Sequence, residues 1–526
     1  MNLKAIELYA KAIESLYSRK NPDDDDLLFE ILLERERLYG LEGRRKEQAE
    51  DLKELSRLAK GVDSRVIKVL VREASYHYAL GSYPVSLERA QAAEELSEKN
   101  RLPVDETVSI KLLVARAMQA LGDLDEVLLK LRSTLAIASQ SGNKLVEASV
   151  QSGFGDFYQS RGDFKLALKH IEEARKLYRE ASDYQSEQRL SGQMGIVYKY
   201  MGQFELARNS FKESLEGAIR TGDKKRETTT LGNLAIVSKN MGLYDEALSY
   251  IEQALATARE IRDRHSESTL LDTLGNIERA LGRYEEAIQH LTTSINLSEE
   301  TGERPLVAKH YSNLASVYSE LGEYAKAIEL EEHSIEISTE VGGLKSEALS
   351  MIKLGALYDI EGEHERAGEL LERALQIFEE TDARTLYMDA LLDIAEHHIL
   401  TGDCKKGRDF IEKARSHAAA YGLEGFDAEI SRLCSEIELK TGNLEEALSI
   451  IDEAVRDKGG GGKLNFLHFS ILERMGEKAR AREIIDRLYS EVSSRAEGIL
   501  DPAARKGFLE NVAFNREIIK AWRRFR

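Results

Sequence analysis

The sequence predicts an all-α protein, a solenoid of about eleven to twelve stacked helical hairpins. Three observations carry this prediction: a glycine that recurs every 40 residues, small residues at fixed distances from it, and only 5 prolines among 526 residues. A repeat of this length is typical of proteins in which each unit packs on its neighbours. The recurring glycines are Gly122, Gly162, Gly202, Gly242, Gly282, Gly322, Gly362, Gly402 and Gly442, with Gly40 and Gly81 out of phase before them, each 41 residues from the next.

Each glycine stands at the predicted end of the first helix of a hairpin. Glycine readily adopts the positive φ that ends one helix and lets the next begin. Seven residues before it and five residues after it the side chain is usually small, which lets the two helices approach closely. The small residues before the glycine are Ala115, Gly155, Gly195, Ala235, Gly275, Ala315, Gly355, Ala395 and Ser435.

This pattern resembles the tetratricopeptide repeat. The unit has a small residue at position 8, Gly at 15, Tyr or Phe at 17, Ala at 20 and a small residue at 27. Each unit is about six residues longer than the usual repeat of that family, and we expect the extra residues to lengthen the two helices. The resemblance implies a right-handed superhelix in which the first helix of each hairpin lines a concave groove.

The two ends of the chain depart from the repeat. We predict a lead helix over 1–25, the solenoid over 26–457, a glycine-rich joint over 458–463, a final short hairpin over 464–495 and a capping segment over 496–526. The joint lacks the Ser or Thr that a phosphate-binding loop needs, so it is interpreted as flexible. The last segment, which contains Trp522, is interpreted as an end cap, with a docking helix for another domain as the alternative.

The composition argues against several classes of partner. Acidic residues outnumber basic ones by 93 to 74, which gives a net charge of −19. We therefore expect no nucleic-acid partner, because phosphate binding needs concentrated positive charge. No apolar run is long enough to span a membrane, so no membrane partner is expected. The N-terminus lacks a secretory signal and the two cysteines are predicted to be free thiols, so we predict a cytoplasmic location.

The sequence shows no pattern of catalytic or metal-ligating residues. The 11 histidines are scattered, and the adjacent pair His397 and His398 would point about 100° apart on a helix. Acidic pairs recur with the repeat itself, as a solvated helix face does. We therefore expect no enzymatic activity, no cofactor and no metal site; an enzyme assembled across repeats is the remote alternative.

The resemblance assigns groove-facing side chains to positions 2, 5, 9, 12 and 13 of the unit. Position 12 carries a cation in three consecutive repeats. Asparagines at position 6 can hold a peptide backbone in members of this family. The predicted peptide-binding residues are Arg189, Lys199, Asn233, Lys239, Asn276, Arg279, Lys309 and Asn313.

We therefore predict a non-enzymatic protein–protein interaction scaffold whose groove binds an extended, acidic segment or a C-terminal carboxylate of a partner protein. Cations held in a concave surface attract an anion more strongly than the same charges scattered over a convex one. The alternative is that these cations only neutralise acidic residues of the repeats themselves, such as Asp272, Glu278 and Glu320.

A second functional hypothesis is a sensor or regulatory arm of a larger signalling ATPase or kinase. The segments 27–45 and 508–516 resemble the flanks of repeat arrays in large prokaryotic signalling proteins. In that case the reading frame would continue upstream of Met1. Both hypotheses leave the partner's identity and the oligomeric state open.

Overall fold

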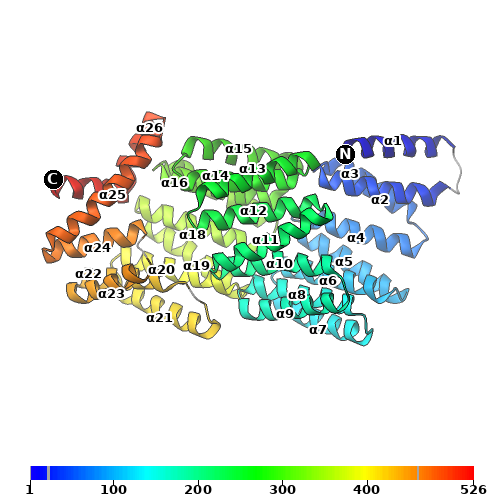
Figure 1. Ribbon diagram of the computed structural model, residues 1–526, viewed down its shortest axis with the longest axis horizontal. Helices are drawn as coiled ribbons and strands as arrows, with labels where there is room; N and C mark the ends of the chain where they lie inside the picture. The colour runs from blue at the N-terminus through cyan, green and yellow to red at the C-terminus, as the bar shows by residue number, and fades with distance from the viewer. Residues whose placement is uncertain (1, 20–23, 424, 459–460, 526) are drawn as a thin grey trace. The chain divides into compact units, whose positions relative to one another are not determined.

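The computed structural model describes residues 2–19, 24–423, 425–458 and 461–525 (Figure 1). All regular secondary structure in this part of the chain is helical, and consecutive helices are joined by short turns. The predicted all-α repeat fold is therefore confirmed. None of the described helices is long and apolar enough to cross a membrane.

The helices pair in chain order into antiparallel hairpins (Figure 1). Those of the N-terminal half are α1 Asn2–Arg19, α2 Asp25–Leu41, α3 Arg45–Leu58, α4 Asp63–Ala79, α5 Tyr83–Lys99, α6 Val104–Leu121, α7 Leu124–Gln140, α8 Lys144–Arg161, α9 Phe164–Glu180, α10 Tyr184–Tyr200, α11 Phe204–Thr221, α12 Lys224–Asn240 and α13 Tyr244–Ile261. Those that follow are α14 Arg264–Ala280, α15 Tyr284–Thr301, α16 Arg304–Glu320, α17 Tyr324–Glu340, α18 Leu344–Glu361, α19 His364–Glu380, α20 Arg384–Leu400, α21 Cys404–Tyr421, α22 Asp427–Thr441, α23 Leu444–Lys458, α24 Gly462–Met475, α25 Lys478–Gly498, α26 Pro502–Glu510 and α27 Ala513–Phe525.

The chain divides into two compact units. The first unit comprises Met1–Ile277, His290–His310 and Ile337–Leu344; the second comprises Glu278–Gln289, Tyr311–Glu336 and Lys345–Arg526. The division cuts across α14 to α18, so the two ends of each of these helices belong to different units. The boundaries predicted at residues 25, 457, 463 and 495 separate the repeat array from the two ends of the chain. The division into compact units does not test them, so they stay predictions. The predicted joint over 458–463 includes residues 459 and 460, which lie outside the described part.

The recurring glycine ends the first helix of each hairpin through a positive φ, as predicted. The angle is +80° at Gly162 and +71° at Gly202, for example. Gly40 behaves differently because α2 continues to Leu41, and Gly43 takes the positive φ, +68°, instead. The turn of the first repeat therefore comes at Gly43, three residues after the glycine that the pattern had assigned to it.

Small residues set the distance between the two helices of a hairpin. A Cβ on Gly155 would lie 2.6 Å from Cγ1 of Ile171, and one on Gly195 would lie 2.7 Å from Cε1 of Phe211. Burying a side chain such as Ile171 stabilises the fold by about 1.5–3 kcal/mol, which requires that the facing position stay small. The alanines after the glycine are fully enclosed: Ala167, Ala207, Ala247, Ala287, Ala327, Ala367 and Ala447.

The C-terminal helices pack within the second unit. Trp522 stacks parallel on Tyr489 with ring centroids 3.7 Å apart, and its indole donates a hydrogen bond to Asp486. The backbone amides of Leu500 and Asp501 donate to the Glu285 carboxylate over 2.6 and 3.1 Å. The end of the chain is thus tied to the first turn of α15.

Candidate functional site

Three lysines gather in the first unit, each on the first helix of a hairpin. They are Lys199 on α10, Lys239 on α12 and Lys309 on α16. Burial lowers the pKa of Lys199, and the nearby charges of Lys309 and Lys239 lower it further. The charges of both other lysines therefore reach Lys199 at a place where water is partly excluded. The fold therefore brings three of the predicted peptide-binding residues into one cluster, called the lysine cluster below.

The partners of these lysines differ. Lys309 Nζ lies 3.1 Å from Oδ2 of Asp272, a carboxylate that is 2 % exposed. Lys199 forms no ion pair with any residue in the described part of the chain, and its Nζ lies 4.8 Å from the centroid of the Tyr200 ring. A surplus of positive charge therefore remains at Lys199.

Two of the predicted residues belong to the second unit. Arg279 donates to the Glu320 carboxylate over 2.5 Å, and Asn313 lies half-buried on α16. Glu320 stands 41 residues after Arg279, so the pair joins neighbouring repeats. Both Arg279 and Lys309 thus contact carboxylates that the neutralisation hypothesis named. Their assignment to a peptide site stays a prediction.

The other three predicted residues lie on first helices of the first unit. Arg189 is exposed on α10, within electrostatic reach of Tyr178 and Asp156. Asn233 is half-buried on α12. The Asn276 amide donates to the Asp272 carbonyl over 2.9 Å, so one of its donors serves its own helix.

The second unit carries an acidic counterpart that the sequence analysis missed. Burial raises the pKa of Asp389 to about 6. Burial, together with the charges of Asp389 and Glu396, raises the pKa of Asp393 to about 7. Arg432, which is 4 % exposed, contacts Glu396 over 2.8 Å and holds its pKa below the usual value against the opposing effect of burial. Extending the position-by-position comparison past residue 359 would have shown this run of carboxylates on α20.

No group of three or more His, Cys, Asp or Glu side chains within the described residues is arranged to hold a metal ion. The two cysteines, Cys404 and Cys434, are both free thiols.

The model of the tetratricopeptide repeat family matches residues 146–220, 226–300 and 306–380. These three segments cover the hairpins from α8 to α19, including the helices that carry the lysine cluster. No curated protein matches the sequence.

Several solved structures are similar to this chain. A Rap protein complexed with competence and sporulation factor is 17% identical with a TM-score of 0.47, and the match covers 68% of this chain and 98% of that one. BtubC from P. vanneervenii is 22% identical with a TM-score of 0.36, over 42% of this chain and 93% of that one. Kinesin light chain-like repeats from Podosopora anserina are 21% identical with a TM-score of 0.32, over 38% and 97%. With identities and TM-scores this low, none of them bears on what this chain binds.

Proposed function

We propose that this chain, a tetratricopeptide-repeat protein over residues 146–220, 226–300 and 306–380, is a protein–protein interaction scaffold that binds an extended acidic segment of a partner at the lysine cluster. The observation that carries the proposal is the half-buried ammonium of Lys199, which lies within electrostatic reach of Lys239 and Lys309 and forms no ion pair with any described residue. Bringing a carboxylate to this place relieves repulsion that the folded chain otherwise retains.

The surroundings favour a peptide over a compact anion. Lys199 and Lys239 occupy the same position in successive repeats, so they can contact residues spaced along an extended strand. Asn233 lies between them in sequence and could hold the strand's backbone with its amide. Because the whole chain has a net charge of −19, it would repel an acidic partner except at such a basic surface.

The proposal is tested with a fluorescein-labelled, Asp- and Glu-rich peptide of roughly ten residues and the full chain. Anisotropy titrations at low salt should show saturable binding that weakens as salt rises to about 0.3 M, because screening shortens the range of the attraction. The double variant Lys199→Glu with Lys239→Glu should lower the affinity at least about tenfold.

The matched control is Lys169→Glu with Lys212→Glu. Both lysines are exposed on second helices, α9 and α11, of the same unit, so this variant changes the net charge equally. It should leave the affinity nearly unchanged. Equal losses in the two double variants would show that net charge, and not the lysine cluster, attracts the peptide.

We assign no catalytic role, and the proposal sets the scaffold in the cytoplasm. If the chain is instead a regulatory arm of a larger signalling protein, it would bind its ligand at the same lysine cluster. An open reading frame continuing upstream of Met1 would favour that second function.

A further inference from the structure

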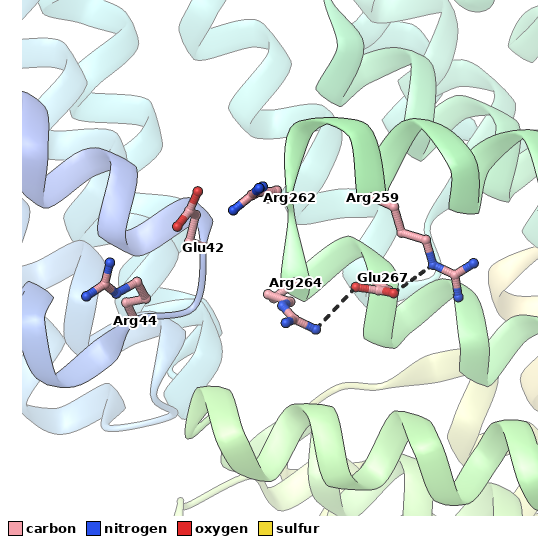
Figure 2. Close-up of a pocket in the computed structure, with 6 residues that line it drawn as sticks. All are labelled: Glu42, Arg44, Arg259, Arg262, Arg264 and Glu267. Atoms are coloured by element: carbon pink, nitrogen blue, oxygen red, sulfur yellow. Dashed lines mark hydrogen bonds and ion pairs between the residues drawn. The ribbon is translucent and has the colours of Figure 1, made fainter. Parts of the chain in front are cut away.

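An arginine-rich pocket of about 360 Å³ lies in the first unit, between two turns that are far apart in the sequence. One wall is the turn from α2 to α3, and the other is the end of α13 with the start of α14 (Figure 2). The residues that line it are Glu42, Arg44, Arg259, Arg262, Arg264 and Glu267. We call it the arginine pocket.

The two walls are fixed to each other. A Cβ on Gly43 would lie 2.3 Å from Cγ2 of Thr301 and 3.4 Å from Cβ of Arg264, so the turn fits there only with glycine. Next to it, Arg45 donates to the Glu303 carboxylate over 2.6 Å, and Nδ1 of His265 lies 3.0 Å from the same carboxylate. Glu303 is 2 % exposed. The pocket is therefore formed before any ligand arrives.

Two of the charged side chains that line the pocket, Arg262 and Glu42, lack partners that the others have. Arg259 and Arg264 share Glu267, with nitrogen–oxygen distances of 2.8 and 3.6 Å. Arg262 forms no ion pair in the described part of the chain. Glu42 is 9 % exposed, and its enclosed Oε1 has no hydrogen-bond partner there. Figure 2 shows Glu42 and Arg262 facing each other from opposite walls.

The backbone of Arg262 adds an independent observation. Its φ is +56°, a left-handed conformation that L side chains rarely adopt. The residues 40 positions before and after it are Gly222 and Gly302, which have φ of +66° and +70°. The chain thus keeps a long cationic side chain at a place where neighbouring repeats use glycine. Ser182 and Asp382 take a positive φ at the same place in other repeats, and Arg262 differs from them in carrying a cation.

We propose that the arginine pocket binds a small organic phosphate, such as a sugar phosphate or a nucleoside monophosphate. Arg44 pairs with Glu47, which lies outside the lining, so four guanidinium groups stand against three carboxylates and the pocket stays net positive. A phosphate dianion matches the planar donors of Arg262. The unpartnered Oε1 of Glu42 accepts a hydrogen bond from a ligand hydroxyl or amino group. The volume lies at the lower end of small-molecule sites.

The test is calorimetric titration of the full chain with four probes: ribose 5-phosphate, AMP, adenosine and inorganic phosphate. At least one of the two organic phosphates should bind, and more tightly than inorganic phosphate or adenosine. Arg262→Gly should lower that affinity at least about tenfold without lowering Tm, since glycine suits a positive φ. Glu42→Gln should weaken the organic phosphate several-fold and leave inorganic phosphate unchanged.

The control is Arg220→Ala, which removes an exposed arginine from the last turn of α11, outside the pocket. It should bind as the unaltered protein does. Failure of both organic phosphates to bind, or full affinity in Arg262→Gly, would overturn the proposal. Equal binding of inorganic phosphate and ribose 5-phosphate would overturn the part assigned to Glu42. The outcome is independent of peptide binding at the lysine cluster.

Discussion

The lysine cluster of the first unit and the carboxylates of α20 in the second unit have opposite charge. The excess charge is compensated differently at the two places. At the lysine cluster, Lys199 keeps its charge next to other cations. On α20, the buried Arg432 offsets part of the negative charge, and the raised pKa of Asp393 lets the rest be neutralised by protons near pH 7. The difference shows that one repeat pattern can carry surfaces of either sign.

The largest effect is expected from removing Arg432, the cation of the acidic surface that Asp389, Asp393, Glu396, Glu429 and Glu436 form on α20 and α22. Arg432→Met should destabilise the second unit by about 3 kcal/mol, because Glu396, Glu429 and Glu436 would lose their shared partner. Urea unfolding followed by the fluorescence of Trp522, the only tryptophan, measures this unit. The control Arg415→Met removes a half-exposed arginine from α21 and should cost less than about 1 kcal/mol.

The next effect is the pH dependence of the acidic surface. Because the folded pKa of Asp393 is raised to about 7, the folded state holds a proton that the unfolded state releases, and stability falls as pH rises from about 4 through 7. Asp393→Asn should therefore add about 1–2 kcal/mol at pH 8 and nothing at pH 4. A variant that is equally stabilised at both pH values would contradict this explanation.

The lysine cluster should show a smaller effect with the opposite dependence on pH. Since the folded pKa of Lys199 is lowered, stability should rise as pH approaches the ordinary value of 10.5 from below. Lys199→Met should add about 0.5–1 kcal/mol at pH 7, and its advantage should shrink at alkaline pH. The measurement is urea unfolding at both pH values. Destabilisation at pH 7 would mean that the ammonium is well compensated.

The smallest effect is expected at the pair of His265 and Glu303 in the first unit, where each group has an opposite charge as its partner. The hydrogen bond with Glu303 raises the pKa of His265, so the stability it contributes is complete below about pH 6.5 and is lost as pH rises through the higher folded value. His265→Gln should cost less than about 1 kcal/mol at pH 6, because the imidazole is half exposed, and less still at pH 9. Thermal unfolding at both pH values checks it.

The repeat fold followed from the sequence because each step has a local cause. Gly155 and Gly195 are needed for close helix packing, and the recurring glycine is needed for a positive φ. Each of these requirements acts within a single repeat, so the same residue types recur in the next repeat. Gly40 departs from its predicted role because α2 continues to Leu41 and the positive φ falls on Gly43.

The candidate site was only partly predictable. Periodicity placed Lys199 and Lys239 at equivalent positions, but it could not show that Lys309 lies within reach of them, or that Arg279 contacts Glu320. The arginine pocket joins segments more than 200 residues apart, which depends on how the hairpins pack together. Arg262 stands where Gly222 and Gly302 stand in the neighbouring repeats, but so do Ser182 and Asp382 in theirs, so this substitution did not single out the pocket.

The contact between Arg45 and Glu303 also limits how this protein can evolve. Ordinary repeat arrays gain or lose a copy with little penalty, since each copy meets only the adjacent ones. Here two residues 258 positions apart form a buried ion pair within one unit. Duplicating or deleting a hairpin between them would shift that register and break the pair, so a change in the number of copies in this stretch carries a penalty in stability.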